Sequence, residues 1–396
     1  MRDQTCTSTR RVRHMLRALA LPLALGLAAC GGGGGGGTTM STPLPPPGFV
    51  DTALVSNTAG VVATTTIIDA NLQNPWGIAF APGSPFWIAD NASNLTTLYS
   101  GTGTVETGAI TGPNATGITI PAGSQGPANP TGQVFNGGGG FLVGGASATF
   151  IFAGESGTIA GWASGDSAVT AYDDGIAHTT NHAVYKGLAM GTVGGATFLY
   201  ATDLHNNKVD VFDTNFTLPP AMQGLFVDPS LPAGFAPFGI TAVTDSKGNI
   251  LLYVTYAMQD TAKHGEVTGA GLGYVDTFDL NGTFVSRFVS QGALNAPWGV
   301  AVAPAGFGSL AGDVLIGNFG DGHINAYTTA GASVGPVAVN SGGTVAIPGL
   351  WALVFGNGDS DKPVTTLFYT AGFEDQTDGV FGTIIPSAST TVMNPY

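Results

Sequence analysis

A short apolar phrase that recurs along the chain indicates how the chain folds. Its two strongest copies run from Asn74 to Phe80 (NPWGIAF) and from Ala296 to Val302 (APWGVAV). Weaker copies, aligned on the tryptophan, place that position at residues 76, 131, 188, 238, 298 and 351. The copies are about 55 residues apart, a spacing typical of repeated structural units. The chain therefore contains six such units.

Each unit continues with features of β-strands. After a turn comes a run of β-branched and aromatic residues, as in residues 86–90 (FWIAD) and 198–202 (FLYAT). A polar loop follows, and then a run that alternates between apolar and polar residues, as in residues 208–213 (KVDVFD). No useful length of the body has apolar residues at helical spacing. Short strands that recur as a phrase distinguish a propeller from a sandwich. We therefore predict an all-β fold, a six-bladed β-propeller of four-stranded antiparallel blades.

The sixth unit is one strand short when the chain ends at Tyr396. Residues 61–68 precede the first phrase and have no other partner, so they could supply the missing outer strand. Pairing of the N- and C-terminal strands in one blade would close the ring and remove the exposed edges of an open array. We expect the propeller to span residues 49–396.

The first 48 residues have the pattern of an export leader followed by a tether. Several arginines precede an apolar run from Leu19 to Leu27 that is too short to span a bilayer permanently. The sequence Leu27-Ala28-Ala29-Cys30 resembles the lipobox of bacterial lipoproteins, in which the cysteine is acylated. This resemblance predicts a signal peptide at residues 1–29 and a lipidated Cys30 that begins a glycine- and proline-rich tether, residues 30–48. An ordinary secretory signal is the alternative. As a lipoprotein, the chain would be exported and anchored to a membrane, facing the periplasm or the cell surface.

The charge of the chain argues against nucleic acid as a partner. The formal net charge is −14. Five of the basic residues are leader arginines, so the predicted propeller carries about −18 and would repel a phosphate backbone. Both cysteines, Cys6 and Cys30, precede the propeller. Its stability must therefore come from packing, and we expect it to be a monomer.

The recurring phrase, followed by a strand that ends in Ala-Asp or Thr-Asp, resembles the NHL-type and related six-bladed propellers. More narrowly, residues 74–77 (NPWG), 317–322 (GNFGDG) and 324–327 (INAY) resemble a family of exported bacterial propeller proteins with no assigned function. This resemblance covers nearly all of the predicted propeller and implies a fold, but it implies no activity.

Polar loop residues provide the candidates for a functional site. Antiparallel strands reverse direction at each turn, so the loop before the first strand and the loop after the second emerge on the same face of each blade. Carboxylates and amides dominate these loops and should converge around the central channel. The candidates are Asp90, Asn91, Glu155, Asp203, His205, Asn206, Asn318, Asp321, Glu374 and Asp375.

Two functions are compatible with this ring of oxygen atoms. The first is a binding module that presents loops to a protein, a glycan or a small molecule. The second is a calcium-assisted hydrolase, because hard cations prefer such oxygens and the ring is similar to that of calcium-dependent lactonase propellers. The sequence requires no cofactor, and Ca²⁺ is the ion that this ring would bind. Asp and Asn are also common in turns for backbone reasons alone, and His205 could simply cap its turn.

Four aromatic residues of the recurring phrase form a further group. They could line a binding site for a sugar or an aromatic ligand, but residues at the start of an inner strand more often pack between neighbouring blades. We expect this packing role for Trp76, Phe238, Trp298 and Trp351.

Overall fold

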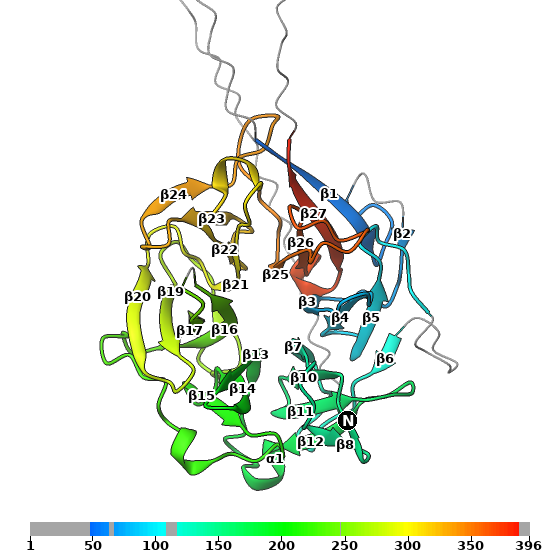
Figure 1. Ribbon diagram of the computed structural model, residues 1–396, viewed down its shortest axis with the longest axis vertical. Helices are drawn as coiled ribbons and strands as arrows, with labels where there is room; N and C mark the ends of the chain where they lie inside the picture. The colour runs from blue at the N-terminus through cyan, green and yellow to red at the C-terminus, as the bar shows by residue number, and fades with distance from the viewer. Residues whose placement is uncertain (1–47, 63–66, 108–116, 246, 388–396) are drawn as a thin grey trace, which may run out of the picture. The chain divides into compact units, whose positions relative to one another are not determined.

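The computed structural model describes residues 48–62, 67–107, 117–245 and 247–387, apart from the side chains of Glu374 and Asp375. The predicted signal peptide, Cys30 and almost all of the tether lie outside this description. The described residues all belong to one compact unit, Pro45–Tyr396. Its small sheets are arranged around a central axis, with the innermost strand of each sheet next to the axis (Figure 1). The predicted six-bladed β-propeller is confirmed.

Four blades contain four antiparallel strands, which follow one another from the axis outwards. Blade 1 consists of β3 (Pro75–Ala79), β4 (Phe86–Asp90), β5 (Leu95–Tyr99) and β6 (Gly117–Thr119). Blade 2 consists of β7 (Pro130–Phe135), β10 (Phe150–Gly154), β11 (Thr158–Trp162) and β12 (Val169–Asp173). Blade 4 consists of β16 (Phe235–Thr244), β17 (Ile250–Gln259), β19 (Tyr274–Asp279) and β20 (Phe284–Ser290). Blade 5 consists of β21 (Pro297–Val302), β22 (Val314–Asn318), β23 (Ile324–Tyr327) and β24 (Ser333–Pro336).

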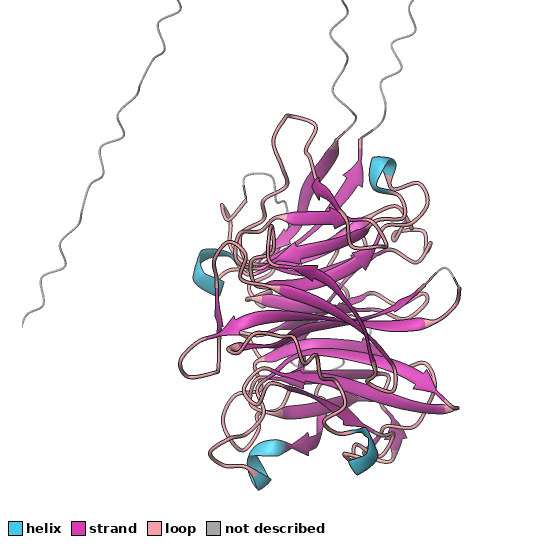
Figure 2. Ribbon diagram, turned by 90° about the vertical axis from the view of Figure 1, so that its left-hand side faces the viewer, coloured by secondary structure: helices cyan, strands magenta, loops and turns pink. Residues whose placement is uncertain are grey.

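Short additional elements decorate these blades. A small hairpin, β8 (Leu142–Val143) with β9 (Ala146–Ser147), follows the inner strand of blade 2, and β18 (Glu266–Val267) pairs with β17. The helical segments are single turns at the periphery of the sheets (Figure 2). They are α1 (Asp174–Ala177), η1 (Pro220–Met222), η2 (Gly308–Leu310) and α2 (Phe373–Gln376). Among the described residues, no helix has the length and apolar character needed to cross a membrane.

Blade 3 departs from the predicted four strands, because it contains only β13 (Tyr185–Val193), β14 (Ala196–Asp203) and β15 (Lys208–Phe212). Beside β15, the side-chain amide of Gln223 replaces part of an outer strand. Its Nε2 donates to the Val211 carbonyl at 2.8 Å and its Oε1 accepts from the Val211 N–H at 3.4 Å. Pro219 and Pro220 precede Gln223 and have no N–H to donate, which disfavours a regular strand there.

Blade 6 closes the ring, as predicted, but with a different N-terminal strand. It contains β25 (Leu350–Phe355), β26 (Leu367–Ala371), β27 (Val380–Pro386), β1 (Phe49–Ser56) and β2 (Ile67–Ile68). β1 pairs antiparallel with β27 from Phe49 opposite Pro386 to Ser56 opposite Val380. The prediction of residues 61–68 as this strand was wrong, since the partner of β27 is β1, and the described part of that region contributes only β2, parallel to the outer edge of β1. The strand was missed because the buried residues of β1 lie at its ends and do not alternate along it.

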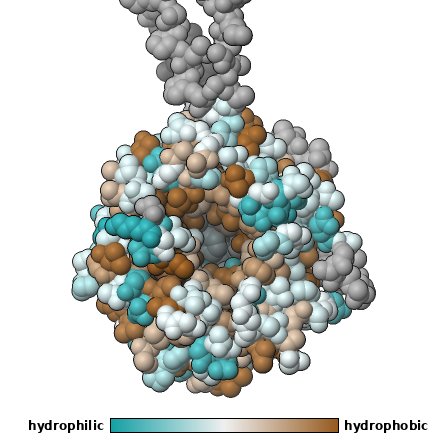
Figure 3. All heavy atoms as spheres, in the orientation of Figure 1, coloured by the Kyte–Doolittle hydropathy of each residue, from teal (hydrophilic) through white to brown (hydrophobic). Residues whose placement is uncertain are grey.

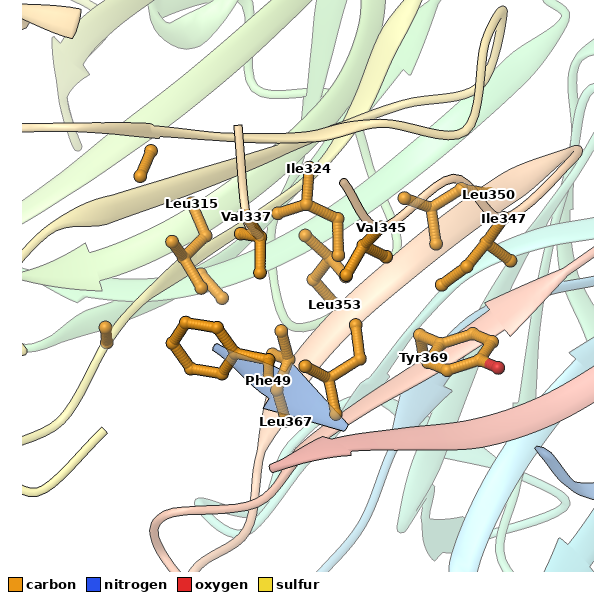
Figure 4. Close-up of a cluster of buried hydrophobic side chains, with 14 of the residues drawn as sticks. Phe49, Leu315, Ile324, Val337, Val345, Ile347, Leu350, Leu353, Leu367 and Tyr369 are labelled. Atoms are coloured by element: carbon orange, nitrogen blue, oxygen red, sulfur yellow. The ribbon is translucent and has the colours of Figure 1, made fainter. Parts of the chain in front are cut away.

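Apolar side chains fill the spaces between adjacent blades. Figure 4 shows one such cluster, in which Leu315 and Ile324 of blade 5 pack with Leu353 and Leu367 of blade 6 and with Phe49. Phe49 is 3% exposed, so the strand that closes the ring also contributes to the core. Removal of these side chains from water is the main stabilising contribution that the sequence offers, since no disulfide is available to the propeller.

Candidate functional site

Every inner strand carries a β-bulge at the recurring phrase. The pairing of the first and second strands shifts register between Pro75 and Ile78 in blade 1, and the other five blades have a shift at the equivalent place. Bulges redirect side chains. In five blades a glycine follows the bulged residue and allows close approach to the next blade; a Cβ on Gly132, for example, would lie 2.2 Å from the Leu188 backbone nitrogen. In blade 6 this residue is Ala352.

The bulged residue of blade 3 is Lys186, which precedes Gly187 as Trp76 precedes Gly77. The sequence alignment placed Leu188 at this position and was wrong by two residues. The six bulged residues are Trp76, Thr131, Lys186, Phe238, Trp298 and Trp351.

The four aromatic members of this set, here called the axial aromatic cluster, pack against one another from blades 1, 4, 5 and 6. The rings of Trp76 and Trp351 are stacked with their centroids 3.5 Å apart. Trp298 meets both edge-on, at 6.0 and 5.9 Å, and Phe238 meets them at 6.2 and 5.9 Å. Trp351 packs as predicted against its neighbours in the adjacent blades, Trp76 and Trp298. Other contacts of the cluster, such as Trp76 with Trp298 and with Phe238, cross the axis. The cluster is buried, so it closes the axis.

Lys186 lies against this cluster with its charge paired. Its side chain is buried, and its ammonium contacts a Glu155 carboxylate oxygen and lies 5.2 Å from the Trp76 ring centroid. Trp298 Nε1 donates to the Lys186 carbonyl at 2.9 Å. Burial alone would lower the pKa of Lys186, but the Glu155 and Glu266 carboxylates outweigh it and raise this pKa.

Two of the predicted site residues, Asn91 and Glu155, meet beside Lys186. Asn91 Nδ2 donates to Glu155 Oε2 at 3.1 Å and to the Asn129 carbonyl at 3.1 Å. Burial would raise the pKa of Glu155, but the charge of Lys186 and the hydrogen bonds from Lys186 and Asn91 lower it. Glu155 is therefore a largely buried, ionised carboxylate, and both of its oxygens have a partner.

A second carboxylate, that of Glu266, lies near the Lys186–Glu155 pair. Glu266 of β18 belongs to the long β17–β19 connection of blade 4. Burial raises its pKa, although the charge of Lys186 acts in the opposite direction. We call Asn91, Glu155, Lys186 and Glu266 the polar end of the axis.

Other predicted residues stabilise turns within their own blades. Buried Asp203 accepts from the Val184 N–H at 3.1 Å and from Asn206 Nδ2 at 2.7 Å, and burial raises its pKa. His205, next in this loop, faces the ring of His182 with the centroids 6.5 Å apart. Asp203 and Asn206 therefore hold the β14–β15 turn together.

Asp90 and Asn318 occupy corresponding places in blades 1 and 5. Asp90 accepts from the Thr97 N–H at 3.0 Å, and burial raises its pKa well above the usual value. Asn318 accepts from the Asn295 N–H at 3.1 Å and donates to Asp321 Oδ1 at 3.1 Å.

The predicted oxygen ring is therefore divided among several local networks. Glu374 and Asp375 fall in α2, and their side chains lie outside the described part of the structure. Among the side chains that are described, no three His, Cys, Asp or Glu form a group that could hold a metal ion.

A cavity lies along the axis among the described residues, and no sequence signal pointed to it. Its volume is about 360 Å³, and we call it the axial well. All six inner strands line it, five of them with residues that follow the bulged position and blade 5 from the bulged Trp298 onwards. The lining residues are 77–80, 132–135, 188–190, 240–242, 298–300 and 352–354. Figure 3 shows a central hollow in the disc, bordered by hydrophobic residues. Trp298 belongs both to the lining of the well and to the axial aromatic cluster.

Comparisons with known proteins identify relatives in a giant virus, and no protein-family model matches the chain. The chain is 34% identical over 340 residues to "Uncharacterized protein R648" of Acanthamoeba polyphaga mimivirus. The aligned region covers 84% of this chain and 78% of the viral protein. The chain is 30% identical over 340 residues to "Uncharacterized protein L690" of the same virus, covering 80% of this chain and 81% of the viral protein.

Similar solved structures have much lower identity. Virginiamycin B lyase from Staphylococcus aureus has 14% identity and a TM-score of 0.47, covering 86% of this chain and 99% of the lyase. The aldose sugar dehydrogenase from Escherichia coli has 12% identity and a TM-score of 0.47, covering 86% and 100%. The GH93 α-L-arabinofuranosidase of Fusarium graminearum has 11% identity and a TM-score of 0.48, covering 85% and 98%. At these identities and TM-scores, the activities of these enzymes are not assigned to this chain.

Proposed function

The chain belongs to the same protein family as the mimivirus proteins R648 and L690, and from the geometry of its axis we propose that it is a binding module that holds a small molecule in the axial well. The observation that carries this proposal is the cavity of about 360 Å³, bordered by all six blades. Cavities of this size and apolar character are where proteins ordinarily bind small ligands. Because the lining comes from the inner strands, all six sheets hold the site in place.

The polar end favours a binding module over a calcium-assisted hydrolase. A calcium site needs several oxygen ligands whose charge is free for the ion. Here the Glu155 carboxylate is already paired with the Lys186 ammonium and Asn91, while Asp203 and Asn318 bond within their own blades.

We further propose that the propeller acts outside the cytoplasm as a monomer, tethered to a membrane through lipidated Cys30. The support is the N-terminal pattern of arginines, apolar run and lipobox-like residues. The membrane would then be one partner and a small molecule the other. The NHL-type character of the repeats stays a prediction.

The ligand proposal is tested with N-phenylnaphthylamine, an uncharged dye whose fluorescence rises when it leaves water. The exposed Ala242 lines the well, so Ala242→Trp should obstruct it. We expect saturable binding to the natural protein and at least a tenfold weaker affinity in Ala242→Trp. Ala330→Trp, at an exposed position that does not line the well, is the matched control. Equal binding to all three proteins would refute the proposed site.

The anchor is tested by Cys30→Ala in a bacterial host that processes lipoproteins. The natural chain should fractionate with membranes and incorporate labelled fatty acid, whereas the variant should incorporate none. Undiminished incorporation of the labelled fatty acid into the variant would rule out Cys30 as the lipidated residue.

A further inference from the structure

The lining of the axial well carries information about the chemistry of its occupant. We infer, resting on the proposed function, that the axial well selects uncharged ligands that combine apolar surface with hydrogen-bonding groups. None of its lining residues is Asp, Glu, Lys, Arg or His. An ion in the well would lose its hydration without gaining a counter-charge, which is strongly unfavourable.

The charged residues nearest in sequence do not change this conclusion. Lys186 is the only charged residue in the six inner strands, and it is not among the lining residues. Its ammonium is paired with Glu155. The charge of the inner strands is therefore neutralised at the polar end of the axis.

Few lining side chains are free to bind a polar group. Gln133 donates through Nε2 to the carbonyls of Gly77, at 2.8 Å, and of Trp87. Trp298 donates its indole N–H to the Lys186 carbonyl. These bonds hold the blades together. Among the described residues, two polar side-chain groups of the lining have no hydrogen-bond partner: the partly exposed Thr241 hydroxyl and the Gln133 side-chain oxygen.

The backbone supplies the remaining hydrogen-bonding capacity of the well. Each inner strand pairs with a neighbour on one side only, β3 with β4, for example, and its other edge faces the axis (Figure 1). Such an edge has unpaired N–H and C=O groups. Backbone dipoles from six strands can therefore bind amide, hydroxyl or ether groups of an uncharged ligand, while the apolar side chains contact its hydrocarbon parts.

The test compares two dyes with one aromatic skeleton. Anilinonaphthalenesulfonate is N-phenylnaphthylamine with an added sulfonate, so the pair differs mainly in charge. We expect the uncharged dye to bind the natural protein at least tenfold more tightly at pH 7, and Ala242→Trp identifies the signal that comes from the well.

A charge placed in the well should reverse this preference. Thr241→Lys should tighten sulfonate binding at least tenfold, and Ala330→Lys, on the exposed surface, should not. If both dyes bind the natural protein equally and Ala242→Trp abolishes both, the inferred selectivity is overturned while the proposed function stands. If neither dye binds at a site that Ala242→Trp obstructs, the proposed function fails as well.

Discussion

Replacement of Lys186 by methionine tests whether the polar end is a buried ion pair. Lys186 is 2% exposed, and its ammonium is the charged partner of Glu155. Methionine preserves most of the apolar stem, so the main change is the loss of the charge and of its contact with the Trp76 ring. Removing one member of a buried pair leaves the other charge unpaired, which costs about 3–5 kcal/mol. We therefore expect Lys186→Met to lower the free energy of unfolding by that amount and the melting temperature by about 5–10 °C.

The assay is urea unfolding at several pH values, because the expected loss depends on the protonation of Glu155. Without Lys186, burial should raise the pKa of Glu155 above its value in the unfolded chain. A carboxyl group with a raised folded-state pKa destabilises the protein as pH increases. The loss of unfolding free energy in Lys186→Met should therefore be largest at pH 8 and become smaller as the pH is lowered to 5. The double variant Lys186→Met/Glu155→Gln should recover much of the lost stability. A loss below about 1 kcal/mol, with the same pH dependence as the natural protein, would refute the buried pair.

Three further changes test other parts of the propeller. Burial raises the pKa of Asp276 to about 7 despite its contact with Arg287. Because this pKa lies above that of Asp in the unfolded chain, stability should fall as pH rises from about 4 to 7. Asp276→Asn should remove this pH dependence from the urea midpoints. Trp351→Ala should cost about 3–5 kcal/mol in the same assay, since the ring is fully buried in the axial aromatic cluster; a loss near 1 kcal/mol would contradict the stacking. Gln223→Ala should cost about 1 kcal/mol and speed hydrogen exchange of the Val211 amide, whereas unchanged exchange would show that the side chain does not protect this edge.

The sequence was sufficient to predict six blades because most of them repeat the same local features. The phrase around Trp76 requires a glycine that lets the next blade approach, and that requirement recurs at Gly239 and Gly299. The third copy was misaligned because Leu188 has the apolar character expected of the phrase, whereas Lys186 does not. Alignment on Gly187 instead would have placed a lysine in a ring of aromatic residues and identified it as a candidate.

The composition of the polar end could be predicted only in part. Loop topology indicated that Asn91 and Glu155 lie on one face, and in the structure a hydrogen bond joins them. Their buried partner, Lys186, could not be identified from the loops, because it lies within an inner strand and reaches Glu155 across a blade boundary. The axial well was not predicted either, since its lining consists of ordinary apolar strand residues and its volume depends on how six separate strands are spaced around the axis.

The axial aromatic cluster should separate the two ends of the axis functionally. Trp298 connects them, because it lines the well and donates to the Lys186 carbonyl through its indole N–H. That acceptor is a backbone atom, so Lys186→Met leaves the hydrogen bond possible while removing the ammonium. We therefore expect this variant, under conditions where it is fully folded, to bind N-phenylnaphthylamine within about twofold of the natural affinity, which is less than 0.5 kcal/mol. A tenfold change would show that the charge at the polar end controls the shape of the well through Trp298, and the two ends would then have to be treated as one site.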